Sequence, residues 1–149
     1  MENTTAKAHR PINIAEIKCT QESLCRVWVE FLTPYHHLTK RQRDVFAVIM
    51  SQYFRIMFQC GSKNMVRTLL WSSQSRADMR RMLGMSQPHF QMVLAKLREC
   101  GVLRGDDINP RYLPHITPDS RSIEMRVIFD YSNPQNKEMP VDEIIGARQ

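Results

Sequence analysis

Residues 75–103 read SRADMRRMLGMSQPHFQMVLAKLRECGVL, and this stretch decides the expected fold. It predicts two helices joined by a tight corner. Ser75 is a favourable N-cap for the first helix, and Gly84 supplies the positive φ that the end of a helix requires. Ser86 caps the second helix, and Pro88 stands in its first turn, where a missing N–H costs little.

Apolar residues recur at helical spacing on both sides of this corner, and Gly101 ends the second helix before an extended segment. The spacing predicts a packed apolar seam that leaves the polar residues of the second helix on the surface. The residues expected in this seam are Met79, Met82 and Leu83 in the first helix and Phe90, Val93, Leu94 and Leu97 in the second.

The run Leu83-Gly84-Met85-Ser86, followed by Leu94-x-x-Leu97-x-x-x-Gly101-Val102-Leu103, resembles the helix-turn-helix and first wing strand of winged helix-turn-helix proteins. In that family the first helix of the pair braces the second, which lies in the major groove of DNA. The resemblance implies a mainly α fold with a small β-hairpin, namely a winged helix-turn-helix with an N-terminal helical extension and a C-terminal tail. It also places helix 86–100 in the major groove.

The rest of the chain divides around this unit. Helices are expected at 13–32, at 40–59 and at 63–71, with Thr33-Pro34 ending the first of them. The helix at 40–59 is apolar over a wide face, which fits either a core helix or one that also packs on a second copy. The expected segments are a flexible arm (1–11), N-terminal helices (12–61), the winged helix-turn-helix (62–131) and a tail (132–149).

The wing is expected to be long. Residues 102–104 form one candidate strand, and residues 123–129 alternate apolar and charged side chains as a half-buried strand does. The connection between them contains Pro110, Pro114 and Pro118, so it is expected to be stiff rather than a two-residue hairpin.

Positive charge is concentrated on the central stretch. The 149 residues carry a formal net charge of +6, and residues 63–104 alone hold eight Lys/Arg against two Asp/Glu. Residues 105–149 hold five against eight. This distribution predicts a surface that faces phosphates, although a solvated basic face would give the same count.

Several classes of protein are not expected. No apolar run has the roughly 20 residues that cross a bilayer, and no hydrophobic segment follows the N-terminus as in a signal peptide. The four cysteines have no CxxC spacing, so reduced thiols are expected. The adjacent His36 and His37 lack nearby metal-ligand partners, and no catalytic motif is present. We therefore expect a non-enzymatic, cytoplasmic protein without membrane contact, metal or cofactor.

If the chain binds duplex DNA, its residues divide into two groups by position. Two features count against DNA binding: the second helix has no arginine on the side that would face the major groove, and Asp106-Asp107 stands at the opening of the wing. The alternative is that Gln87 and Gln91 belong to a polar surface without a binding role. The expected base-reading residues are Gln87, His89, Gln91, Met92 and Lys96, and the expected phosphate-binding residues are Ser75, Arg76, Arg80, Arg81, Arg111 and Arg121.

Two functions are compatible with these features. The first is a transcriptional regulator that reads double-stranded DNA as a homodimer, or larger homo-oligomer, formed through its N-terminal helices. The second is a phage protein of the virion or its assembly, such as a neck, packaging or structural component, that uses a winged-helix scaffold to dock on other phage structural proteins.

Overall fold

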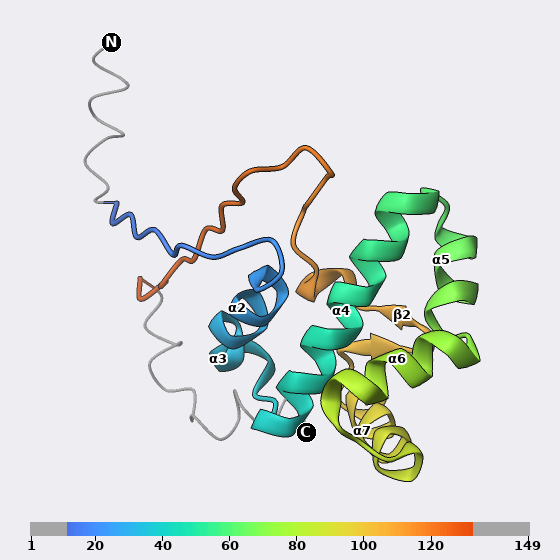
Figure 1. Cartoon of the computed structure of the whole chain (residues 1–149). Coiled ribbons are helices and arrows are strands. Elements are labelled where there is room, and N and C mark those ends of the chain that lie inside the picture. Colours follow the sequence, from blue (N-terminus) through green and yellow to red (C-terminus); the bar gives the residue numbers. More distant parts are fainter. Residues whose placement is uncertain (1–11, 133–149) are drawn as a thin grey trace.

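The computed structural model describes residues 12–132, and in this range the chain is mainly helical with one small antiparallel sheet (Figure 1). The proposed arm 1–11 and all but the first residue of the proposed tail 132–149 lie outside the described residues. The elements are α2 (Leu24–Phe31), α3 (Thr33–His36), α4 (Lys40–Cys60), α5 (Lys63–Leu70), α6 (Ser73–Leu83), α7 (Gln87–Glu99), β1 (Leu103–Arg104), β2 (Asp107–Ile108) and η1 (Pro110–Tyr112).

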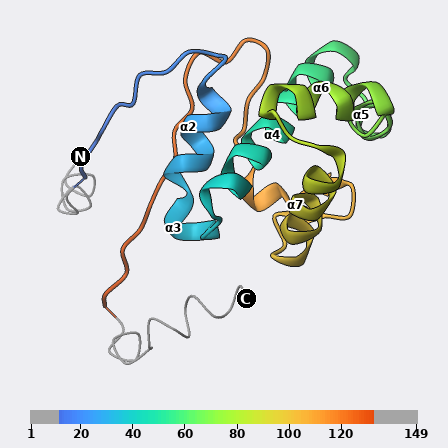
Figure 2. The same ribbon diagram turned by 60° about the horizontal axis from the view of Figure 1, so that its bottom comes forward.

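Helix α4 is the central element, and it packs against α2, α5, α6 and α7 (Figures 1 and 2). It begins with a capping box between Thr39 and Gln42 and ends at Gly61, whose φ is 69°. The helix predicted at 40–59 is therefore confirmed. Its wide apolar face is covered within the chain, because Phe46 and Met50 are fully buried beneath these neighbours.

The N-terminal helix predicted at 13–32 is wrong in its first half. Only Leu24–Phe31 is helical, and residues 12–22 are exposed, including Ile14 at 87%. The hydroxyl of Thr20 accepts a hydrogen bond from the Ser23 backbone N–H, and this local turn precedes the helix. The apolar residues that reach the core all lie after this turn, so helix formation before it would bury nothing.

Thr33-Pro34 ends α2, as expected, but the chain then forms the short helix α3 rather than an irregular connector. Proline stands in the first turn of α3, where it is tolerated. His36 is buried at the end of α3: its Nε2 donates to the Val29 carbonyl, and its Nδ1 accepts from the Leu38 N–H at 3.0 Å.

Helix α5 matches the expected 63–71 helix to within one residue. The next helix does not begin at Ser75, as predicted. The hydroxyl of Ser72 caps α6, while Ser75 lies inside it, buried, with its hydroxyl accepting a hydrogen bond from Gln52. Both serines are good caps by type, and the burial of Ser75 against α4 selects the earlier one.

The predicted pairing of residues 102–104 with 123–129 is also wrong. β1 pairs with β2, with Leu103 opposite Ile108, and the connection is the two-residue turn Gly105-Asp106. Gly105 has the positive φ, 64°, that such a turn uses. Leu103 and Ile108 are both buried, so the core holds this short hairpin. Residues 123–129 form no strand.

After β2 the chain returns to the other side of the core. Tyr112, at the end of η1, is buried with its ring edge-on to Phe46 at 6.4 Å between centroids, and its carbonyl accepts from Trp28 Nε1 at 2.8 Å. No helix within residues 12–132 combines the length and apolar content that crossing a membrane requires.

Candidate nucleic-acid interface

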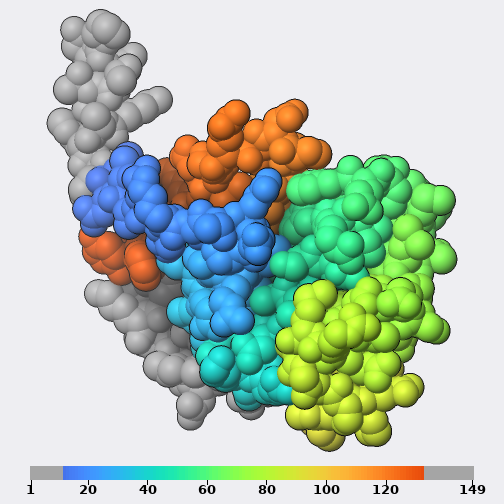
Figure 3. Space-filling view, in the orientation of Figure 1, coloured from blue at the N-terminus to red at the C-terminus, as the bar shows by residue number. Residues whose placement is uncertain are grey.

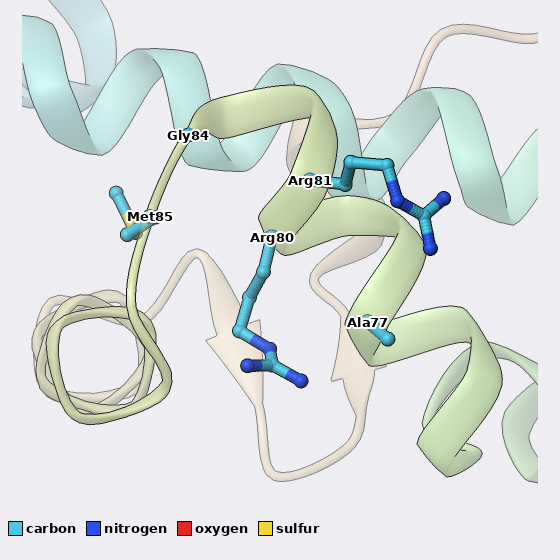
Figure 4. A pocket seen from close by; sticks show the side chains of 5 residues that line it. All are labelled: Ala77, Arg80, Arg81, Gly84 and Met85. Atoms are coloured by element: carbon cyan, nitrogen blue, oxygen red, sulfur yellow. The ribbon is translucent and has the colours of Figure 1, made fainter.

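The corner between α6 and α7 is built as the sequence predicts. Gly84 has a φ of 61°, and the Met85 N–H reaches back to the Arg80 carbonyl at 3.0 Å. The Met85 side chain is buried in the corner, and Ser86 then caps α7 by accepting from the His89 N–H (Figure 4). The chain therefore passes from α6 to α7 through three residues, Gly84, Met85 and Ser86. Together α6 and α7 form a lobe on the side of the molecule away from α2 (Figures 2 and 3).

Helix α7 has one buried face and one free face. The predicted seam of Phe90, Val93, Leu94 and Leu97 is confirmed, with three of the four fully buried. On α6 only Met79 is fully buried; Met82 is 61% exposed and Leu83 is half-buried, so the prediction is wrong for Met82. The buried residues of α7 therefore hold the helix on the core, with its other face toward solvent.

The five expected base-reading residues do not form one row. Each residue advances about 100° around a helix. Gln87 and Gln91 are therefore one turn apart on one flank, whereas His89 and Lys96 share the opposite flank. Met92, 57% exposed, lies between them. Gln87 and Lys96 are exposed, and His89 and Gln91 are half-buried.

Two arginines extend from the C-terminal turn of α6, close to the corner that leads into α7. Arg80 and Arg81 line an open depression of about 600 Å³ together with Ala77, Gly84 and Met85, and their guanidinium groups point in different directions (Figure 4). Arg81 contacts Asp78 at 2.9 Å yet remains 71% exposed. Arg80 makes no ion pair or hydrogen bond through its side chain within residues 12–132.

Other basic residues of this stretch are engaged by the hairpin. Arg67 makes two hydrogen bonds of 3.1 Å to the Asp107 carboxylate, and Arg98 donates to the Gly105 carbonyl and contacts Asp106 at 3.7 Å. Folding therefore brings two carboxylates onto the basic stretch. Residues 63–108 hold eight Lys/Arg against four Asp/Glu, a smaller excess than residues 63–104 alone suggest.

Trp71, which the sequence analysis did not single out, organises this arrangement. Its Nε1 donates to the Asp106 carbonyl at 2.8 Å, and the guanidinium groups of Arg76 and Arg98 lie over its ring, 5.5 and 5.9 Å from the centroid. Arg76 also donates to the Trp71 carbonyl. Arg76, predicted to bind phosphate, is thus half-buried in a contact that holds the hairpin against α5 and α6.

The three remaining predicted phosphate contacts lie in different parts of the fold. Ser75 is buried and bonded to Gln52, so its hydroxyl does not reach the surface. Arg111 donates to the hydroxyl of Tyr35, a residue of α3. Arg121 is exposed in the segment that follows η1. Arg80 and Arg81 therefore lie near the corner that leads into α7, whereas Ser75 is buried and Arg111 is bonded to α3.

Nothing in the described residues resembles a metal centre, since no group of three or more His, Cys, Asp or Glu side chains gathers there. Comparison of the chain with known protein families, with curated proteins and with solved structures finds no match.

Proposed function

We propose that the chain binds double-stranded DNA through a winged helix-turn-helix, with α6 as the bracing helix, α7 as the recognition helix and the β1–β2 hairpin as a short wing. The observation that carries the proposal is the corner at Gly84. It leaves Gln87 and Met92 of α7 exposed, and it stands next to Arg80, whose side chain makes no ion pair or hydrogen bond within residues 12–132. Helix-turn-helix proteins read DNA with the N-terminal residues of the second helix.

The residues of the lobe then have different roles. Gln87 and Gln91, on one flank of α7, have amide groups that can pair with an adenine edge, and Met92 can contact a thymine methyl group. Arg80 and Arg81 neutralise phosphates, as does Lys96 on the other flank. His89 shares the flank of Lys96, where a ring nitrogen can donate to guanine. The role that we propose for a chain with both base-reading and phosphate-binding residues is that of a transcriptional regulator.

Anisotropy of a labelled duplex at low salt tests the proposal. Arg80→Ala is expected to weaken binding to every duplex and to reduce the slope of log K against log salt by about 0.9. Gln91→Ala is expected to weaken binding to selected duplexes, by roughly 1–3 kcal/mol, and to leave random duplex unchanged.

Arg26→Ala is the matched control, because Arg26 is exposed on α2, across the molecule, and its removal changes the net charge equally (Figure 1). Absence of duplex binding by the wild-type protein at low salt refutes the proposal. Equal effects of the Arg26 and Arg80 variants refute the assignment of the binding face.

A second candidate function is docking to another protein, as in a phage virion or assembly component. Its supporting observation is that Met65 and Leu69, one turn apart on α5, are 53% and 44% exposed. The engagement of Arg67, Arg76 and Arg98 by the fold also leaves fewer cations for DNA than the composition suggests. A partner that protects Met65 from oxidation and covers Leu69, together with absence of duplex binding, would favour this function.

A further inference from the structure

The segment 121–129 has the sequence of a β-strand but no partner strand. Ile123, Met125, Val127 and Phe129 alternate with polar or charged residues, apart from Ile128, and β-branched residues favour strands. In the structure, however, Val127 is 53% and Phe129 is 84% exposed.

The backbone of this segment is equally unpartnered. Within the described range, residues 121–129 make no backbone–backbone hydrogen bond; the last such bond before them joins the Ser120 N–H to the Thr117 carbonyl. The trace runs beside α2 and then away from the helices (Figure 2). An exposed apolar strand edge with free N–H and C=O groups is a template for another strand.

The charges of the segment identify the strand that fits it. In an antiparallel pair with a two-fold axis at Met125, Glu124 of each chain lies opposite Arg126 of the other. The same register places Ile123 opposite Val127 and Met125 opposite Met125. A shift to an axis at Arg126 sets two arginines against each other, and a shift that pairs odd with even positions sets apolar against charged side chains.

A register with its axis at Ile128 would instead pair Arg126 with Asp130. The Asp130 carboxylate, however, already accepts hydrogen bonds from the Ser132 N–H at 3.1 Å and the Ser132 hydroxyl at 2.7 Å. These bonds form a local turn that ends the extended stretch. The axis at Met125 uses residues 121–129, sets Arg121 opposite Phe129 only at the two ends of the pair, and leaves this turn intact.

We propose that residues 121–129 form an antiparallel, two-fold symmetric strand pair with the same residues of a second copy of the chain. The interface is isologous, as in most homodimers. It does not use the α6–α7 lobe and does not depend on DNA binding. Because a two-stranded ribbon is only marginally stable by itself, the dimer is expected to be weak and to form as protein concentration rises.

Charge reversal tests the pairing. Sedimentation of the wild-type chain at increasing concentration is expected to show a monomer–dimer equilibrium. Glu124→Arg or Arg126→Glu alone places like charges opposite each other at two points, so each is expected to raise the dissociation constant about tenfold or more. The double variant Glu124→Arg/Arg126→Glu restores both pairs and has the wild-type net charge, so it is expected to dimerise like the wild type. An equimolar mixture of the two single variants is expected to form the heterodimer.

Cysteine cross-linking tests the register in a Cys19→Ser background, which removes the exposed native thiol. Opposed residues in antiparallel strands have Cα atoms about 4.5–5.5 Å apart, within disulfide range. Met125→Cys is therefore expected to give a disulfide-linked dimer. Val127→Cys is the matched control, because in this register its two copies are about 13 Å apart.

A wild-type chain that stays monomeric at all concentrations overturns the proposal. So does equal dimerisation of the wild type and both single variants, or a disulfide-linked dimer of the Val127→Cys variant where the Met125→Cys variant gives none. Slow amide exchange of residues 123–129 in a monomer would assign the strand to a partner within its own chain, and this outcome also overturns the proposal.

Discussion

Neutralising the hairpin carboxylates tests how the chain divides its positive charge between its own fold and DNA. In Asp106→Asn/Asp107→Asn, Arg67 loses its ion pair with the Asp107 carboxylate, and Arg98 loses its contact with Asp106. The side chains of both pairs are 34–56% exposed. Each pair is therefore worth about 0–1 kcal/mol, and the variant is expected to lose at most about 2 kcal/mol of unfolding free energy.

Both guanidinium groups then have no carboxylate partner and become available to phosphates near the wing, while Arg98 keeps its hydrogen bond to the Gly105 carbonyl. Each phosphate that a protein neutralises contributes about −0.9 to the slope of log K against log salt on duplex DNA. Two additional contacts steepen this slope by about 1.8. A fourfold rise in salt should then weaken the variant by about 12-fold more than it weakens the wild type, with tighter binding of the variant at low salt.

Anisotropy of a labelled random duplex between about 50 and 200 mM salt measures the salt slope and the low-salt affinity. The matched control is Glu22→Gln/Asp119→Asn, which removes two exposed carboxylates outside the hairpin. A slope and a low-salt affinity equal to those of the control would refute the reasoning, because the released arginines would then face no phosphate.

Three further predictions concern the stability of the fold. Burial lowers the pKa of His36 below its ordinary 6.5, an effect that the hydrogen bond to the Val29 carbonyl partly offsets and the Arg43 charge increases. The unfolded chain therefore binds more protons than the folded chain, so the unfolding free energy should fall as pH drops below about 6.5. Urea unfolding of His36→Asn should show a weaker dependence of this free energy on pH. A pH dependence equal to that of the wild type would contradict this prediction. Gly84→Ala places a side chain at a φ of 61° and should lower the free energy of unfolding in denaturant by about 1–2 kcal/mol. Gly84→Asn should lower it less. An alanine variant as stable as the wild type would show that this φ imposes no strain. Phe90→Ala empties a fully buried position and should cost about 3–5 kcal/mol, against less than about 0.5 kcal/mol for the exposed Met92→Ala, and similar losses would contradict the assigned faces of α7.

The parts of the fold that depend on local signals were predictable from the sequence. Gly84, Ser86 and the apolar seam of α7 act within a few residues of one another, so their types and spacing specify the corner directly. The same holds for Ser62 at the start of α5 and for Gly61 at the end of α4.

The errors occur where a distant contact decides between local options. Ser72 and Ser75 are both competent caps, and the bond from Gln52 to Ser75 decides which of them lies inside the helix. The alternation at 123–129 indicates an amphipathic segment but does not name its partner strand. The Gly105-Asp106 pair is a recognised signal for a two-residue hairpin, and the structure pairs the strands on either side of it.

The site was less predictable than the fold, because charge counts do not reveal which side chains meet. Arg67 is 40 residues from Asp107, and Arg98 is 8 residues from Asp106, the carboxylates that they contact. Trp71 also binds the hairpin, through its hydrogen bond to the Asp106 carbonyl. These contacts arise from the docking of the hairpin, which no local pattern describes. Arg80 remains a cation next to the corner between α6 and α7, without an ion pair within residues 12–132.

An NMR titration with a short duplex at low salt tests the central claim most directly. The claim predicts that the side-chain amide resonances of Gln87 and Gln91, and the backbone amides of residues 86–96, shift on addition of DNA. The side-chain amide of Gln21, exposed before α2, is expected to stay unchanged. Unshifted resonances throughout α7 at saturating duplex would contradict the claim.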